Sequence, residues 1–577
     1  MKLMLKYLFR HKVLFCLNMI CAFGFAVVEL GIPTIFGNMV DLGVEKANPA
    51  AIYSGFGQIL VVAIIGTIGM LSLAYVSSRL STTIVYEIRK DLFEHAMSFS
   101  AAELDHFGVS SMITRTGSDD YQILMFLNTL LKSSLISPIM LLVSVILIIQ
   151  TSLPLSFIVL GTIPFILIGV IIVFRIAGPL SQKQQTSLDQ INEILRENMS
   201  GIRVIRAFNN QVTEEKRFTA ENRQYMSVTS RLFKLMNMTD PMFFFLMNIA
   251  SMMIYYTAAV LLGNEQLQLG QLLMFVEYLF HCMMSVLVLC MVFMMYPRAS
   301  VSAKRIQEVL ETKPSIFSEK SLQNLERIDS IEFDHVGFRY PGNEQHSLKN
   351  ISFSAKTGQK IAVVGSTGSG KSSLIRLINR FYDANEGQIR INGTPIEEYD
   401  LQVLRNQISM VSQKAHMFSG SVEDNIRFGN RQADNDDILE AIEIAQASDF
   451  IAERENGLLD EISEEGTNLS GGQKQRLSIA RAIISNASFF ILDDSFSALD
   501  LKTDASLRKA LEPLRQNSIF LVVAQRISSI LDADLILILD HGEIQAMGTH
   551  QELYKNSPLY REIVLSQMSE MEAEKYA

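Results

Sequence analysis

The sequence contains few charged residues and few cysteines. Charged side chains make up only 19% of its 577 residues, whereas hydrophobic residues make up 49%. Soluble proteins of this length seldom have such a composition, so long apolar runs that cross a membrane are expected. The formal net charge is -10, so the chain lacks a basic excess. This argues against nucleic acid as a partner, because phosphate binding needs a concentrated basic surface.

The few cysteines also exclude two kinds of site. All four lie within apolar runs and none shows C-x-x-C spacing; they are Cys16, Cys21, Cys282 and Cys290. This pattern indicates free thiols in the membrane and favours neither a disulfide framework nor a zinc site. A small-residue cleavage site does not follow the first apolar run, so we expect no cleavable signal peptide.

Six apolar segments in the first half are each long enough to cross a hydrocarbon core of about 30 Å. They cover approximately residues 13–35, 56–76, 127–149, 153–174, 242–262 and 272–296. The segment before the first span carries Lys2, Lys6, Arg10 and Lys12, whereas the connection at 150–154 carries no charge. The positive-inside rule therefore places the N-terminus in the cytoplasm, and six spans return the C-terminus to the same side.

Two connections, 77–125 and 177–240, are far longer than a membrane hairpin requires. Their charged residues recur among apolar ones at helical spacing, which predicts spanning helices that continue into the cytoplasm as long rods. Beyond residue 326 the pattern changes to strand-like stretches, such as 330–338 and 359–364, interleaved with helical ones. This alternation is typical of an α/β domain.

A phosphate-binding pattern follows the apolar strand at 361–364. Residues 365–372 read Gly-Ser-Thr-Gly-Ser-Gly-Lys-Ser and precede a helical run. Glycines let backbone N–H groups turn toward phosphate oxygens, Lys371 reaches the β and γ phosphates, and Ser372 is a ligand for Mg²⁺. The motif predicts bound ATP with Mg²⁺, held by Gly365, Ser366, Thr367, Gly368, Ser369, Gly370, Lys371, Ser372 and Ser373.

Two further segments complete the pattern. A second apolar strand at 489–492 ends in Asp493, the position of a carboxylate that holds Mg²⁺ beside the phosphate loop. Between the two strands, residues 469–473 read Leu-Ser-Gly-Gly-Gln. With this segment the chain resembles an ABC exporter half-transporter of the type I, multidrug-exporter-like kind, and the resemblance covers nearly the whole chain.

The resemblance implies roles for further residues. Tyr340 is expected to stack on adenine, Gln413 to be a Mg²⁺ ligand together with Ser372 and Asp493, and residues 497–500 to form the D-loop that ends at Asp500. In this family two ATPase domains close head to tail. The resemblance therefore implies that Ser470, Gly471, Gly472 and Gln473 contact the ATP bound by the other chain. Residues 105–120 and 201–208 resemble the family's two intracellular coupling segments.

The expected fold is multidomain. An all-α six-helix transmembrane domain with long cytoplasmic helical extensions covers 1–312, a linker follows at 313–330, an α/β P-loop ATPase domain covers 331–565, and a C-terminal tail covers 566–577. The resemblance implies an ATPase coupled to transport across a bacterial cell membrane.

Two catalytic positions depart from the family. Asp494 stands where a glutamate usually positions the attacking water, and its carboxylate is one methylene shorter. Gln525 replaces the switch histidine and cannot exchange a proton near neutral pH. The pair resembles the degenerate-site subunit of heterodimeric bacterial exporters, which predicts a second, non-identical half-transporter as partner. The alternatives are drift at two positions, or a slow but active homodimer.

Methionines are concentrated in the last two spans. Twelve lie between residues 236 and 295, and flexible thioethers suit varied amphipathic, drug-like molecules. One helical face is predicted to line a substrate cavity and carries Met274, Glu277, His281, Met284 and Met291. For Glu277 and His281, the alternatives are a pair that only fixes helix packing and a site for a porphyrin or soft metal. For the whole protein, the alternatives are a homodimeric lipid flippase or exporter and an ATP-gated sensor or channel.

Overall fold

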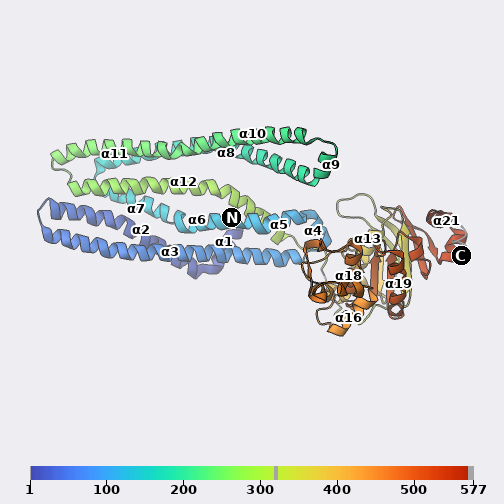
Figure 1. Ribbon diagram of the computed structural model, residues 1–577. Helices are drawn as coiled ribbons and strands as arrows, with labels where there is room; N and C mark the ends of the chain where they lie inside the picture. The colour runs from blue at the N-terminus through green and yellow to red at the C-terminus, as the bar shows by residue number, and fades with distance from the viewer. Residues whose placement is uncertain (1, 318–321, 569–577) are drawn as a thin grey trace. The chain divides into compact units, whose positions relative to one another are not determined.

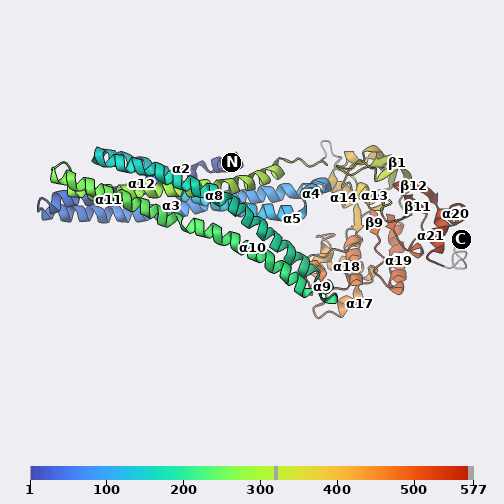
Figure 2. The same cartoon turned by 90° about the horizontal axis from the view of Figure 1, so that it is seen from above.

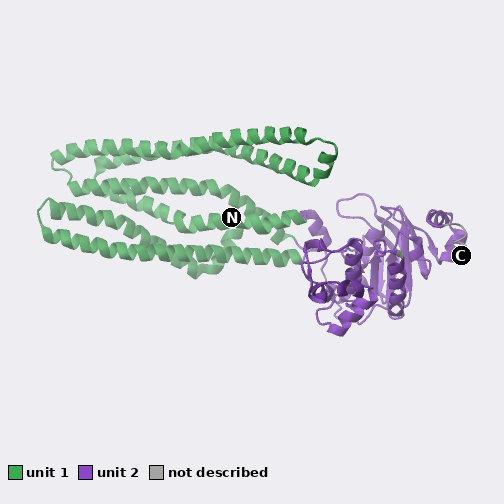
Figure 3. Ribbon diagram, viewed as in Figure 1, with its two compact units in different colours: residues 1–97, 109–312 green, residues 98–108, 313–577 purple. Residues whose placement is uncertain are grey.

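The computed structural model describes residues 2–317 and 322–568, and the chain divides into two compact units, coloured separately in Figure 3. Unit 1 comprises residues 1–97 and 109–312, and unit 2 comprises residues 98–108 and 313–577. The segment 98–108 groups with unit 2, although the sequence alone places it in the transmembrane domain. Residues 318–321 of the expected linker and 569–577 of the expected tail lie outside the described residues.

Unit 1 is all-helical and contains six long apolar helical segments (Figure 1). Each sequence-predicted span falls within a different one of them, so the predicted fold class is confirmed. The segments are Lys2–Val44, Pro49–Met97, Val109–Thr151, Leu153–Ser200, Gln211–Gly263 and Leu269–Glu311. Their helices are α1 (Lys2–Leu8), α2 (Lys12–Met39), α3 (Pro49–Met97), α5 (Val109–Thr114), α6 (Asp120–Thr129), α7 (Ile136–Thr151), α8 (Leu153–Ser200), α10 (Gln211–Asn237), α11 (Thr239–Gly263) and α12 (Leu269–Glu311).

The helices are longer than a bilayer requires. Helix α8 has 48 residues, and at 1.5 Å per residue it is about 72 Å long, more than twice the hydrocarbon thickness. Figure 2 shows α8 and α10 side by side as they approach the short helix α9 (Ile202–Ala207). The apolar side chains of Ile202, Val204 and Phe208 are exposed at this tip.

Polar contacts inside unit 1 join helices that are distant in sequence. Asn18 of α2 is fully buried; its Nδ2 donates to the Leu131 carbonyl at 3.0 Å, and its Oδ1 accepts from the Ser77 hydroxyl at 2.6 Å. Leu131 lies in a π-helical turn, Leu130–Ser134, where the regular α-helical hydrogen bonding is interrupted. Asn18 therefore satisfies a backbone acceptor that has no water to bind in an apolar interior.

Unit 2 contains two main sheets. The antiparallel sheet has the order β2-β1-β4-β5, with β1 (Ser330–Phe338), β2 (Leu348–Lys356), β4 (Glu386–Ile391) and β5 (Thr394–Pro395). The other has the order β12-β11-β3-β10-β9-β6 and is parallel except for β12. Its strands are β3 (Lys360–Gly365), β6 (Ile408–Val411), β9 (Phe489–Asp493), β10 (Ile519–Val523), β11 (Leu535–Asp540) and β12 (Glu543–Gly548).

The six-stranded sheet separates two hydrophobic cores, because successive side chains of a strand point to opposite faces. Ile361 and Val363 of β3 belong to the core shared with the antiparallel sheet, whereas Ala362 and Val364 belong to the other. Helix α13 (Lys371–Ile378) covers the first core. The second core is covered by α15 (Val422–Arg427), α16 (Asn435–Ile444), α17 (Ser448–Ala452), α18 (Gly471–Ile483), α19 (Leu501–Arg515), α20 (His550–Asn556) and α21 (Pro558–Leu565).

Helix α4 (Ala101–Phe107) explains why residues 98–108 group with unit 2. The Tyr382 hydroxyl donates to Asp105 Oδ2 at 2.7 Å, and the Ser315 N–H donates to Glu103 Oε1 at 3.1 Å. Glu103 also accepts from the Ser100 N–H, which caps the helix. Hydrogen bonds from this short helix thus attach it to residues more than 200 positions away.

We expect Asn18→Ala to lower the thermal stability of the detergent-solubilised chain. The substitution leaves the Leu131 carbonyl unpaired in an apolar interior, a loss of about 1–3 kcal/mol. Cys16→Ala, on an exposed position of the same helix, is the control and should melt like the wild type. Equal melting temperatures for Asn18→Ala and the wild type would show that this hydrogen bond does not contribute.

Candidate nucleotide-binding site

The predicted phosphate loop begins at the carboxyl end of β3, in the middle of the six-stranded sheet. β3 pairs in parallel with both β10 and β11, and β10 pairs in parallel with β9. Parallel strands end at the same edge of a sheet, and the crevice there is where ligands usually bind in α/β folds. A cavity of about 1140 Å³ lies at this edge. Its wall contains these predicted residues: Tyr340, Thr367, Gly368, Gly370, Lys371, Ser372, Ser373, Gln413, Asp493, Asp494 and Gln525.

The loop's glycines are required by space and conformation. A side chain on Gly365 would overlap the carbonyl oxygen of Leu539 on the neighbouring strand. Gly370 has φ +107° and precedes α13, so the chain turns there in a conformation that other residues rarely adopt. Ser366 and Ser369 lie in the same turn but not in the cavity wall. The loop therefore directs the N-terminus of α13 at the cavity, which favours an anion.

Lys371 is the cation of this loop. Its Nζ donates to the carbonyl oxygens of Gly365 at 2.9 Å and Ser366 at 2.7 Å. Burial lowers the pKa of the Lys371 ammonium, while the carboxylates of Asp493 and Asp494 raise it. The ammonium is thus partly desolvated, and a desolvated charge interacts more strongly with phosphate than one in water.

The oxygen donors expected for Mg²⁺ all line the cavity. Ser372 is the second residue of α13, Asp493 ends β9 and Gln413 follows β6. A hydroxyl, a carboxylate and an amide oxygen fit Mg²⁺, which prefers oxygen ligands and few protein groups. Burial raises the pKa of Asp493, and the Asp494 charge adds to this effect while Lys371 opposes it. A bound cation would therefore favour the ionised carboxylate.

Asp494 and Gln525 contact each other directly. Gln525 Nε2 donates to Asp494 Oδ2 at 2.9 Å, and Gln413 Nε2 lies 3.5 Å from the same oxygen. The Asp494 N–H donates to the Val523 carbonyl at 2.8 Å, which holds its backbone at φ +49°. One oxygen of the carboxylate at the predicted water-positioning place thus already accepts hydrogen bonds from side-chain amides.

Tyr340 follows β1 and stands at the cavity wall. Its hydroxyl lies 3.0 Å from the Ser373 hydroxyl and accepts a hydrogen bond from Arg376 at 3.1 Å. The ring packs edge to face against Tyr382, with centroids 5.3 Å apart. These contacts fix the orientation of an aromatic ring beside the phosphate loop.

The segment resembling the signature lies elsewhere on unit 2. Ser470 caps α18: its Oγ accepts from the Gln473 N–H at 3.3 Å, and Gln473 Oε1 accepts from the Ser470 N–H at 2.9 Å. Asp500 caps α19 through the N–H groups of Lys502 and Thr503. Within the described part of the chain, the cavity wall contains none of Ser470, Gly471, Gly472, Gln473 and Asp500. Ser470 and Gly471 are exposed.

The predicted substrate face of α12 is not uniform. Met274 is 8% exposed and packs in the helical core near Gly37, His281 and Met284 are half-buried, and Glu277 and Met291 are exposed. His281 interacts electrostatically with Glu29 of α2 as well as with Glu277. The helical spacing identified the Glu277–His281 pair, but only packing of α2 against α12 reveals the second carboxylate.

Several cavity residues could not be identified from the sequence. They come from the loop between β1 and β2 and from the turn between β11 and β12: Asn343, Glu344, Gln345, His346, Ser347, His541 and Gly542. A Pro-Gly-Asn run after Tyr340 signals the first loop, yet no local pattern shows that it reaches the phosphate site. Gly542 approaches the Ser347 carbonyl, which brings the two loops together.

Comparisons with known proteins agree with this architecture. Residues 15–287 match the family described as the ABC transporter transmembrane region, and residues 348–497 match the family described as ABC transporter. The chain is 35% identical to the uncharacterized ABC transporter ATP-binding protein YfiB of Bacillus subtilis, over 94% of both chains. It is 31% identical to a putative export ATP-binding/permease protein of Rickettsia felis, over 98% of both chains.

A solved structure shows the same fold. A bacterial Atm1-family ABC exporter with ATP bound superposes with a TM-score of 0.79 at 21% identity, covering 96% of this chain and 98% of that one. Both regions of the family are present here in one polypeptide. The chain therefore belongs to the ABC transporter family, as a multi-pass membrane protein with an exporter fold whose transmembrane region is fused to an ABC ATPase domain.

Proposed function

We propose that this chain is one subunit of a heterodimeric ABC exporter and that its own ATP site binds nucleotide but hydrolyses it slowly or not at all. The observation that carries the proposal is the contact between Asp494 and Gln525 at 2.9 Å. Both departures from the family's pattern meet in one place, whereas the phosphate loop and Asp493 keep the residues that binding requires.

Nucleotide binding is supported by the residues of the cavity wall. The amides of the phosphate loop and the start of α13 donate to the phosphates, Lys371 neutralises their charge, and Tyr340 offers a ring to adenine. Ser372, Gln413 and Asp493 would hold Mg²⁺, which screens the phosphate charge when bound. None of these roles requires the residues at positions 494 and 525.

Hydrolysis needs a group that orients and polarises water at about 3 Å. The Asp494 carboxylate is drawn back by one methylene relative to glutamate, and Oδ2 already accepts from Gln525 and from Gln413. An oxygen that already accepts two amide hydrogen bonds has less capacity left to bind the attacking water. Gln525 itself has no proton to exchange near pH 7. Such a loss reduces rate by about 10²–10⁴.

The exposed start of α18 is suited to a phosphate presented by another chain. The Ser470 oxygen accepts from the Gln473 N–H, so its own O–H remains free to donate outward beside the amide of exposed Gly471. A helix N-terminus favours anions.

The exposed apolar tip at α9 also supports contact with a partner chain, because Val204 is 60% and Phe208 78% exposed in the single chain. We propose that the partner's ATPase domain covers it.

A contrast between two positions of this chain tests the assignment. In the complex purified through a tag on this chain, we expect Asp494→Asn to change ATP turnover by less than about threefold and Gly472→Glu to reduce it by about 10²-fold or more. Thr549→Ala, which removes the cap of another helix of unit 2, controls for a general loss of stability in this unit and should keep normal turnover. Equal losses for Asp494→Asn and Gly472→Glu would indicate one composite site in a homodimer and contradict the proposal.

Differently tagged copies of the chain give a direct test of subunit composition. When both are co-expressed without any other half-transporter, we expect neither copy to retain the other during purification, and each to show little ATPase activity. The matched control is a solved homodimeric exporter treated in the same way. Co-purification of the two tags together with turnover that Lys371→Ala abolishes would overturn the heterodimer.

For the transported compounds we propose amphipathic, drug-like cations. The supporting feature is the group formed by Glu277, His281 and Glu29, since ionisable groups within spans usually face water or a pathway. The nearby methionines add polarizable surface that adapts to different apolar shapes. Packing alone would also explain buried Met274, so the proposal rests on the acidic residues.

We expect Glu277→Gln to reduce transport of amphipathic cations about fivefold or more relative to neutral compounds, because it removes one of two carboxylates near His281. Transport would be measured in reconstituted vesicles, with basal ATPase activity as the control for folding. Val301→Ala, at an exposed position of the same helix outside the predicted span, should leave cation transport unchanged. Equal transport of all compounds by Glu277→Gln would exclude this residue from the cavity.

A further inference from the structure

The backbone that carries Gln525 is held by side chains from distant parts of unit 2. We call residues 525–529 the switch segment. Gln567 donates from Nε2 to the Gln525 carbonyl at 2.8 Å and accepts from the Ile527 N–H at 2.9 Å. Lys360, at the start of β3, donates from Nζ to the Ser529 carbonyl at 3.1 Å. The segment is therefore attached at both ends to the body of unit 2.

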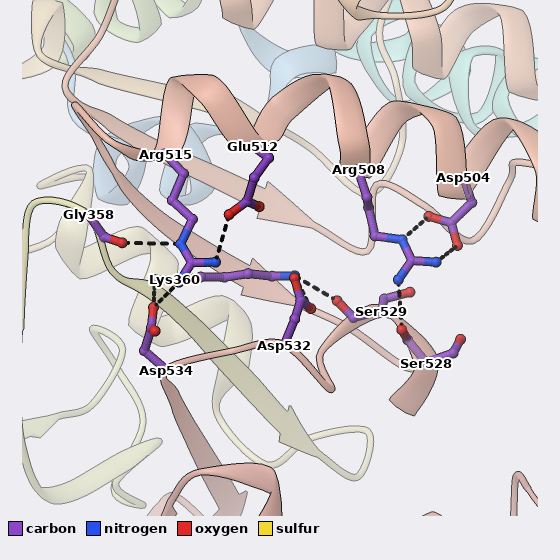
Figure 4. Close-up of polar contacts among 10 residues, drawn as sticks. All are labelled: Gly358, Lys360, Asp504, Arg508, Glu512, Arg515, Ser528, Ser529, Asp532 and Asp534. Atoms are coloured by element: carbon purple, nitrogen blue, oxygen red, sulfur yellow. Dashed lines mark hydrogen bonds and ion pairs between the residues drawn. The ribbon is translucent and has the colours of Figure 1, made fainter. Parts of the chain in front are cut away.

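A third attachment comes from α19 (Figure 4). Arg508 Nη1 donates to the Ser528 carbonyl at 2.8 Å. The same guanidinium grips Asp504 with two bonds, Nε to Oδ1 at 3.1 Å and Nη2 to Oδ2 at 3.2 Å. The Asp504 side chain is only 1% exposed, so a buried carboxylate fixes the orientation of the Arg508 guanidinium. Two nitrogens on one edge of the guanidinium thus bind Asp504 on the same helix, and the remaining nitrogen binds the backbone of the switch segment.

Helix α19 connects the hydrogen bonds of Arg508 to the D-loop, residues 497–500. Asp500, the last residue of the D-loop, caps α19, so a displacement of the first turns of the helix also displaces the loop. Arg526 adds a direct bond, from Nη2 to the Ser497 carbonyl at 3.2 Å. A side chain on Gly472 would lie 3.2 Å from the Ala498 carbonyl, so the D-loop rests against the first turn of α18. A continuous set of contacts therefore runs from Gln525 to the exposed start of α18.

The other end of α19 offers a natural comparison, also visible in Figure 4. Arg515 donates to the Gly358 carbonyl at 3.1 Å and to Asp534 Oδ2 at 2.6 Å. It also pairs with Glu512, as Arg508 pairs with Asp504. Arg515 contacts neither the switch segment nor the D-loop through these bonds. Arg515 therefore anchors α19 as Arg508 does, but it lacks a hydrogen bond like the one that Arg508 makes to the switch segment.

We propose that Arg508 and Arg526 are positioning residues that couple the switch segment to the D-loop, so that nucleotide in this chain's own site repositions the D-loop and the start of α18. The inference rests on the proposed nucleotide site, whose occupancy is the signal. Such coupling explains how a site that does not hydrolyse ATP influences the surface offered to a partner. The coupling is a free energy between the nucleotide site and the D-loop. A contact that fixes the D-loop therefore also changes the affinity for nucleotide.

Hydrogen–deuterium exchange of the full chain in detergent, with and without MgATP, tests this coupling. In the wild type we expect MgATP to slow exchange in three places: the phosphate loop at 365–373, the switch segment and the D-loop. In the double variant Arg508→Met with Arg526→Met, the phosphate loop and the switch segment should still respond to MgATP. The MgATP affinity should stay within about twofold of the wild-type value. The D-loop response should fall about fivefold or more. Arg515→Met is the control and should respond like the wild type.

Two milder variants guard against a folding artefact. Arg526→Met alone, in a surface loop, should lose part of the D-loop response. Arg508→Lys should retain part of it, because an ammonium reaches the Ser528 carbonyl but cannot grip Asp504 with two bonds. An unchanged D-loop response in the double variant, or an equal loss in Arg515→Met, overturns the coupling and leaves the nucleotide site standing. Absence of any change at 365–373 overturns the site and the coupling together.

Discussion

The parallel pairing of β3, β10 and β9 is the constraint on which the candidate site depends. Its register places Val523, the last residue of β10, between Asp493, the last residue of β9, and Val363, two residues before the end of β3. The segments that leave these strand ends must then meet at one edge: the phosphate loop after β3, Gln525 after β10 and Asp494 after β9. A slip of one residue would turn every core side chain of a strand to the wrong face, so two hydrophobic cores hold this register.

In the proposed site, binding and chemistry use different atoms. Phosphate binding would rely on backbone N–H groups and on Lys371, whose positions depend on the turn geometry of Gly365 and Gly370. Chemistry would rely on the reach and protonation of two side chains, at positions 494 and 525. A side chain shortened by one methylene leaves the strand end where it was, since the Asp494 N–H bonds to the Val523 carbonyl independently of it.

The sequence predicts those features that depend on local pattern. Six spans and the phosphate loop could be located because apolar length and glycine spacing are properties of neighbouring residues. It could not assign residues 98–108 to the second unit, because that depends on Asp105 meeting Tyr382, 277 positions away. The proximity of Glu29 to His281 and the loop carrying His346 in the cavity wall were missed for the same reason. The direct bond from Gln525 to Asp494 likewise requires the sheet to bring two loops together.

In the proposed heterodimer, the arrangement around α19 would give a site without a strong base a remaining role. Gln525 is an amide, so it forms the same kind of hydrogen bond at any pH near neutrality and has no second protonation state. Its backbone is held by Gln567, and the neighbouring backbone is held by Arg508 and Lys360. These hydrogen bonds to the switch segment do not involve the Asp494 carboxylate. In the proposed subunit, loss of hydrolysis would therefore remove the chemical step and leave this path from the cavity to the D-loop intact, because the two depend on different bonds.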